Sequence, residues 1–149
     1  MAAGLDEHDV YSAVLTEVET GVDLGSALLG KNYSPEQADA VLEQLEKYIP
    51  EVSYDAVGIG WAVDDGEARV HVAYHFDSED DATAGLKTLE TAWSDAPSQA
   101  GRPMSDYVSV EDAATDGSVA TISLGVAEDA GPGIVMSFLQ QREPVFVSR

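Results

Sequence analysis

Residues 56–76 read AVGIGWAVDDGEARVHVAYHF, and this stretch predicts a β-hairpin. As far as Val63, large apolar side chains alternate with glycine and alanine, which is the two-residue period of a strand with one bulky face and one small face. Asp64-Asp65-Gly66 has the composition of a tight hairpin turn. The alternation then resumes from Val70 to Phe76, so the stretch predicts two antiparallel strands.

A helix is predicted on each side of this hairpin along the chain. Before it, Ser34 can cap a helix, Pro35 suits the first turn and Gln37 completes a capping box. After it, Ser78 can cap a second helix whose first turn is acidic, which complements the helix dipole. Apolar residues recur at helical spacing at Ala38, Val41, Leu42, Leu45 and Tyr48 in the first helix and at Ala82, Leu86, Leu89 and Trp93 in the second.

The rest of the chain adds strands and a last helix. Residues 11–15 fit a strand or a helix, and we favour the strand; a second hairpin is predicted over residues 107–124. A short helix follows Gly131-Pro132-Gly133, and residues 145–147 are expected to form an edge strand. The order β-α-β-β-α-β-β predicts an α+β fold with an antiparallel sheet backed by helices, in a ferredoxin-like or split β-α-β arrangement with an added hairpin. We expect one domain over residues 1–149, with a mobile start at residues 1–9.

Charge is the strongest feature of the composition. The chain of 149 residues has 28 acidic and 7 basic residues, and a formal net charge of −21, although 44% of its residues are hydrophobic. The acidic residues are spread through expected turns and helix faces, whereas an acidic tail concentrates them in one block. Binding to nucleic acid or to an anionic membrane surface is disfavoured because both need basic patches.

An acidic surface of this kind is suited to concentrated salt. The distance over which charges repel falls from about 10 Å at 0.1 M to about 3 Å at 1 M salt, so the repulsion among carboxylates is relieved there. Only three lysines are present, Lys31, Lys47 and Lys87. In composition and in its acid-rich turns the chain resembles uncharacterised envelope-type, exported proteins of halophilic archaea. This resemblance implies a salt-adapted surface and an extracellular or cell-envelope location.

Other sequence features leave the compartment open. The chain has no cysteine, which excludes disulfides, thiolate metal sites and a cysteine nucleophile. No apolar run approaches the length of about 18 residues needed to cross a bilayer. The start, Met1-Ala2-Ala3-Gly4, does not have the regions of a signal peptide. A cytoplasmic protein of a salt-accumulating cell would have these features, as would an exported domain whose targeting segment had been removed.

His71 and His75 are the most suggestive pair of metal-ligating residues. On a helix their spacing would place both imidazoles on one face, as zinc ligands require. On the predicted strand they also share a face, but lie about 13 Å apart at roughly 3.3 Å per residue. One ion cannot bind both, so we predict no metal site and no cofactor.

Two further candidate sites are weaker. A ligand pocket between the sheet and the helices would be lined by Trp61, Tyr74, His75 and Asp77, although Asp77 also suits the helix start. Asn32-Tyr33-Ser34 is a glycosylation sequon in an expected surface loop, which matters only if the protein is exported. No catalytic serine motif and no dinucleotide fingerprint is present.

These patterns together favour a non-catalytic role. We expect a salt-adapted surface or secreted domain that binds a protein partner or forms part of an envelope assembly, with solvated cations at its acidic surface. One alternative is a small-molecule-binding protein or an enzyme that uses the pocket described above. Another is a cytoplasmic oligomerisation or regulatory module.

Overall fold

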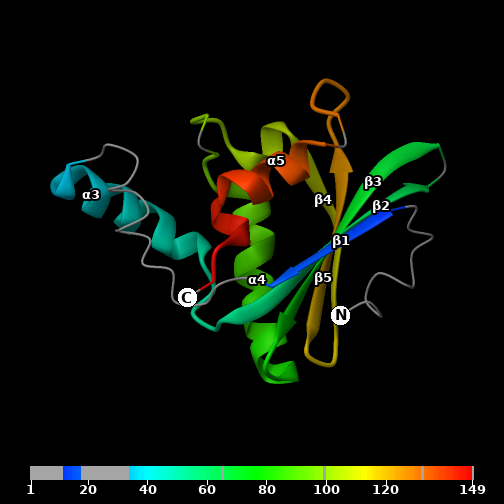
Figure 1. Ribbon diagram of the computed structural model, residues 1–149, viewed down its shortest axis with the longest axis horizontal. Helices are drawn as coiled ribbons and strands as arrows, with labels where there is room; N and C mark the ends of the chain where they lie inside the picture. The colour runs from blue at the N-terminus through cyan, green and yellow to red at the C-terminus, as the bar shows by residue number, and fades with distance from the viewer. Residues whose placement is uncertain (1–11, 18–33, 65, 99, 132, 149) are drawn as a thin grey trace.

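The computed structural model describes residues 12–17, 34–64, 66–98, 100–131 and 133–148 (Figure 1). Its elements in chain order are β1 (Ser12–Glu17), α3 (Pro35–Leu45), the 3₁₀ turn η1 (Glu46–Tyr48), β2 (Tyr54–Asp64), β3 (Glu67–Phe76), α4 (Glu79–Asp95), η2 (Met104–Asp106), β4 (Val108–Asp116), β5 (Val119–Val126), α5 (Ile134–Gln141) and η3 (Pro144–Phe146). The first strand, which the sequence left open between strand and helix, is therefore a strand.

The strands form one antiparallel sheet in the order β1-β2-β3-β5-β4. Because β3 and β4 are both antiparallel to β5, they are parallel to each other, and α4 connects them along the chain. The segment β3-α4-β4 is thus a split β-α-β unit with β5 inserted between its strands. The predicted α+β class and antiparallel sheet are confirmed, and both predicted hairpins are present as β2–β3 and β4–β5.

Local sequence signals set the helix starts. Ser34 and Gln37 form the predicted capping box, in which each side chain accepts a hydrogen bond from the other residue's backbone N–H. The Ser78 hydroxyl accepts from the Asp81 N–H at 3.2 Å and caps α4. Figure 1 shows α4 and α5 on the same side of the sheet, whereas α3 extends away from them.

The hydrophobic core lies between the sheet and the helices α4 and α5. The strands contribute side chains that alternate along each strand, and the helices contribute the residues that the helical spacing predicted. The fully buried members include Val57, Ile59, Val70, Val72, Tyr74, Phe76, Leu89, Trp93, Ile122 and Leu124. We refer to this side as the helix-facing side of the sheet.

The residues that alternate with this core form the other side, which we call the polar face of the sheet. Gly58, Gly60, His71, Ala73 and Ser123 are among them and are buried, whereas the remaining members include Arg69, His75, Thr121 and Gly125. Two strands are interrupted on this sheet by register shifts, at Asp55 in β2 and at Glu111 in β4. A shift of this kind adds one residue to a strand and can turn a side chain toward the neighbouring strand.

The end of the chain differs from the sequence-based expectation. Residues 145–147 were expected to form an edge strand, but Pro144–Phe146 is a 3₁₀ turn and the prediction was wrong. Pro144 has no N–H to donate to a neighbouring strand, and Val145 and Phe146 are instead buried in the core. The segment 144–148 therefore completes the core rather than the sheet.

Candidate functional site

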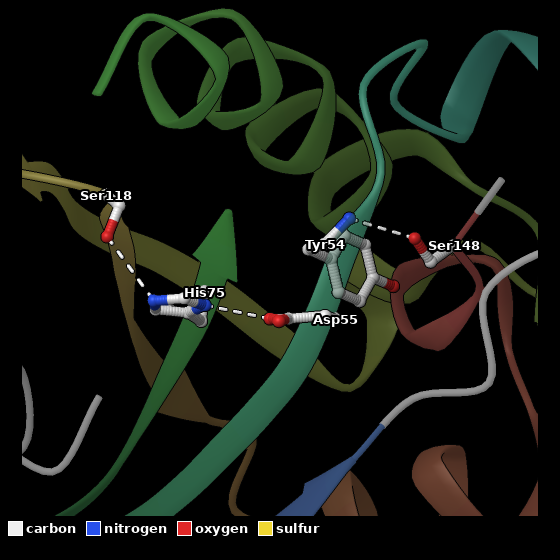
Figure 2. Close-up of polar contacts among 5 residues, drawn as sticks. All are labelled: Tyr54, Asp55, His75, Ser118 and Ser148. Atoms are coloured by element: carbon white, nitrogen blue, oxygen red, sulfur yellow. Dashed lines mark hydrogen bonds and ion pairs between the residues drawn. The ribbon is translucent and has the colours of Figure 1, made fainter. Parts of the chain in front are cut away.

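Among the described residues, polar side chains on the polar face of the sheet form two pairs and one group of three. Arg69 forms an ion pair with Glu111, the His71 Nδ1 lies 2.8 Å from the Ser123 hydroxyl, and His75 contacts both Asp55 and Ser118. Only the histidine of the last group is both partly exposed and in contact through both ring nitrogens. We therefore take Asp55, His75 and Ser118 as the candidate site (Figure 2).

Asp55 reaches His75 because of the irregularity in β2. Tyr54 pairs with Phe76 and Ala56 pairs with His75, which leaves Asp55 as an extra residue in the strand. An extra residue locally breaks the alternation of side chains, so Asp55 can turn toward the residue that Ala56 faces. Its Oδ1 lies 2.8 Å from the His75 Nδ1.

Ser118 reaches the same histidine from the opposite neighbour of β3. Gly117 and Ser118 form the two-residue turn between β4 and β5, with Gly117 at φ +54, a conformation that glycine adopts at the first central position of a tight hairpin. The Ser118 carbonyl accepts a hydrogen bond from the Phe76 N–H at 2.8 Å, which fixes the turn against the end of β3. The Ser118 hydroxyl then lies 3.4 Å from the His75 Nε2.

The order carboxylate–imidazole–hydroxyl determines which ring nitrogen of His75 carries the proton. A carboxylate can only accept, so a hydrogen bond between Asp55 and the His75 Nδ1 requires the proton on Nδ1. In the neutral ring this leaves the lone pair on Nε2, directed at the Ser118 hydroxyl. The same order of groups allows a histidine to take a proton from a serine in acyl-transfer enzymes.

The site is open to solvent. The side chains of His75 and Asp55 are 36% and 58% exposed, and Ser118 is half-buried. Exposure to water weakens the electrostatic part of the His75–Asp55 contact, which is worth at most about 1 kcal/mol for a pair of this kind. The positions of these three side chains are therefore set by the backbone of β2, β3 and the turn between β4 and β5, and not by the burial of charges.

Tyr54, which precedes Asp55, is fixed in the core on the other side of the sheet (Figure 2). Its N–H donates to the Ser148 hydroxyl at 2.9 Å, and its own hydroxyl donates to the Val145 carbonyl at 3.1 Å. These bonds join the start of β2 to the segment 144–148. They hold the backbone directly beside the irregular residue Asp55.

The two buried tyrosines next to the site are not acid–base groups at ordinary pH. Burial, and secondarily the neighbouring Tyr74, raises the pKa of Tyr54 well above its usual value. Burial likewise raises the pKa of Tyr74, against a smaller opposing effect of the hydrogen bond that the Trp93 Nε1–H donates to its hydroxyl at 2.9 Å. Both phenols stay neutral and serve the packing of the core.

The structure separates the four residues predicted to line a pocket. Tyr74 is completely buried on the helix-facing side, whereas His75, the next residue, lies on the polar face. Trp61 is half-buried on the helix-facing side but pairs with Val70, four residues from Tyr74 along β3, and Asp77 is exposed before α4. Of the four, only His75 belongs to the candidate site. Asn32, the predicted glycosylation site, lies outside the described residues.

Sequence reasoning missed Asp55 and Ser118. Ser118 lies within the hairpin predicted over residues 107–124, but its contact depends on β5, not β4, being the neighbour of β3. A pairing between strands far apart in the sequence leaves no local pattern. The residues next to Asp55, the extra residue of β2, include no glycine and no turn motif that would have predicted the irregularity.

His71 and His75 lie on a strand, as the alternation predicted, so the helical spacing for zinc does not apply to them. Among the described residues, no group of three or more histidine, aspartate or glutamate side chains could bind a metal ion. In the same part of the chain, none of the helices is both long and apolar enough to span a membrane.

Comparison with protein-family models, with curated proteins and with solved structures found no match to this chain.

Proposed function

We propose that this chain is a salt-adapted, non-catalytic interaction domain of a halophilic archaeon, displayed at the cell surface or secreted. It acts by binding a protein partner or a further copy of itself through its exterior. The observation that carries this proposal is the exposure of carboxylates outside a buried aromatic core, on the elements α3, η1, β2, β3, α4, η2 and β4. The location rests on the resemblance to exported haloarchaeal proteins.

Three of the seven basic residues make local contacts, which strengthens the acidic character of the surface. The Arg102 Nε lies 2.9 Å from Asp106, a contact that raises the pKa of Arg102, and Arg69 pairs with Glu111. The Lys47 ammonium lies 4.7 Å from the centre of the Tyr48 ring. The remaining exposed carboxylates therefore face one another and the solvent, which favours a medium of high ionic strength.

The packing between the sheet and the helices favours an exterior interaction over a ligand enclosed there. Trp93 makes ring contacts with Phe138 and Phe146, and Tyr74 makes them with Tyr54 and Phe146. All five side chains are buried. The space in which a small molecule was considered from the sequence is occupied by these rings.

Salt adaptation predicts a strong dependence of stability on KCl. Between about 1 M and about 0.1 M KCl the screening length grows from about 3 Å to about 10 Å, so the carboxylates repel one another more. We expect the melting temperature to fall by about 10 °C or more, which corresponds to several kcal/mol for a domain of this size. Far-UV circular dichroism during thermal melts measures the change.

A charge-reduced variant is the matched control. Asp39 and Glu43 are exposed on α3 at a spacing of four residues, where like charges repel. The variant Asp39→Asn with Glu43→Gln should lose less stability on dilution of the salt than the native chain. A melting temperature that is the same at both salt concentrations would exclude salt adaptation.

A second experiment distinguishes a partner-binding domain from a ligand-binding one. Thermal-shift measurements in molar KCl with a panel of metabolites and divalent metals should give no reproducible rise in melting temperature. A reproducible rise with any one compound would replace the interaction proposal by a ligand-binding function. Antibodies raised against the chain should detect it in the medium or envelope fraction of its source cells, and detection only in the cytoplasm would overturn the location.

A further inference from the structure

We propose that Ser118 is an acylation site, at which an activated ester or thioester transfers one acyl group to the serine hydroxyl with His75 as the base. The proposal goes beyond the interaction function and does not need turnover of a substrate. It rests on the contact of the Ser118 hydroxyl with the His75 Nε2 at 3.4 Å and of the His75 Nδ1 with Asp55 at 2.8 Å.

The backbone prepares these three groups before any reagent binds. Ser118 is fixed by the two-residue turn and by the bond from the Phe76 N–H to its carbonyl. Asp55 is fixed as the extra residue of β2, with Tyr54 held beside it by two hydrogen bonds. Neither contact arises from residues adjacent in sequence, since β2, β3 and the turn between β4 and β5 each contribute one group.

The transfer step balances within these groups and the acyl donor. The Ser118 Oγ forms a bond to the carbonyl carbon, and its proton moves to the His75 Nε2. The bond from the carbonyl carbon to the leaving oxygen or sulfur then breaks, and the leaving group takes that proton. Asp55 accepts the Nδ1–H and so keeps the lone pair on Nε2, which makes Asp55 a positioning residue.

The exposure of the site indicates which donors fit it. Because His75 and Asp55 are 36% and 58% exposed, the reagent approaches from solvent and needs little shape complementarity. We therefore expect reaction with small donors that have a good leaving group. The resulting alkyl ester has a much poorer leaving group, so the modified chain should accumulate.

The test uses p-nitrophenyl acetate on the full chain in molar KCl. Release of p-nitrophenolate is followed by absorbance, and the acetylated residue is located by mass spectrometry of peptides. Ser105, an exposed serine of η2, is the internal reference. A well-placed general base contributes about 10²–10⁴ in rate. Because the contact here is 3.4 Å long and open to water, we expect a smaller factor, with Ser118 reacting at least about tenfold faster than Ser105.

Variants assign the roles. Ser118→Ala should abolish the fast phase, and His75→Gln should reduce acetylation of Ser118 by about tenfold or more, to the rate of Ser105. Asp55→Asn should also slow it, because the amide no longer fixes the proton on Nδ1, whereas Asp55→Glu should restore part of the rate. These substitutions at exposed or half-buried positions should leave circular dichroism and the melting temperature nearly unchanged, so a lower rate would not come from unfolding.

Several outcomes would overturn the proposal. Acetylation of Ser118 no faster than that of Ser105 would show that the hydroxyl is not activated. A fast phase that survives in Ser118→Ala but disappears in His75→Gln would make His75 itself the nucleophile. A rate of acetylation at Ser118 that is unchanged in His75→Gln would show that His75 does not act as the base. None of these results would affect the salt and partner experiments, so the two proposals fail separately.

Discussion

On the helix-facing side of the sheet the buried side chains are large and aromatic, whereas the polar face of the same strands carries glycine, alanine, serine and histidine. Consecutive residues of β3 show the contrast, because Tyr74 is completely buried in the core and His75 is partly exposed beside Asp55 and Ser118. A strand can hold both since its side chains alternate. The comparison teaches that the buried aromatic core and the proposed acylation site lie on opposite sides of the same strands, so that each can be changed separately.

The largest expected effect comes from removing the centre of the helix-facing side. Trp93→Ala deletes a buried ring that contacts Phe138 and Phe146 and donates a hydrogen bond to Tyr74. We expect a loss of about 3–5 kcal/mol in the free energy of unfolding, measured by denaturant titration in molar KCl. Trp61→Ala, at a half-buried position of the same side, is the control and should cost clearly less. Equal losses would contradict a core centred on Trp93.

Alkaline pH should also act on the helix-facing side. The pKa values of Tyr54 and Tyr74 are raised in the folded chain, so the unfolded chain releases these protons first, near pH 10. The stability they provide is present below pH 10 and is lost as the pH rises, by about 1.4 kcal/mol per pH unit for each tyrosine. Thermal melts from pH 9 upward should show this slope, and Tyr54→Phe should reduce it by about half. A slope that is the same in Tyr54→Phe would show that Tyr54 ionises in the folded state.

One identical substitution can be compared on the two sides. A methyl group added at Gly85 of α4 would overlap the ring of Phe76, which is buried and cannot move freely. At Gly125 of β5 it would meet the ends of the Glu111 and Ser109 side chains, which are exposed and can turn away. Gly85→Ala should therefore cost about 1–3 kcal/mol, as overpacking does, and Gly125→Ala clearly less. Denaturant titration measures the loss in the free energy of unfolding for each variant. Similar losses for the two variants would contradict the difference in packing between the two sides of the sheet.

The smallest effect is expected for the ion pair of the polar face. Glu111→Gln removes the charge opposite Arg69, and both side chains are partly exposed. The change should cost less than about 1 kcal/mol and should shrink further in molar salt, where exposed charges are screened. Melting temperatures at two KCl concentrations test this, and a cost that rises with salt would contradict it.

The parts of the fold that depend on neighbouring residues were predictable. The Ser34 capping box, the Ser78 cap and the strands around Asp64 all follow from chemistry within a few residues of the chain. Residues 145–147 were mistaken for a strand because a run of β-branched and aromatic residues suits a strand and a buried turn equally. Only the position of Pro144 hinted at the difference.

The candidate site was predictable only through His75. Asp55 reaches His75 because it is itself the extra residue of β2. Ser118 reaches His75 because β5 lies between β3 and β4. Both causes are properties of how strands pair, which the sequence does not express as a local pattern. The expected pocket joined Tyr74 and His75, although the alternation of side chains along a strand already assigns them to opposite sides.

The segment 144–148 also bears on the order in which the chain can fold during synthesis. Tyr54 donates to Ser148, 94 residues later, and Phe146 completes the ring contacts of Trp93 and Tyr74. A ribosome makes about 5–20 residues per second, so several seconds pass between the synthesis of β2 and that of the segment 144–148. During that interval the aromatic side of the sheet is incomplete and its apolar surface is exposed, which is when partly folded chains are prone to aggregate.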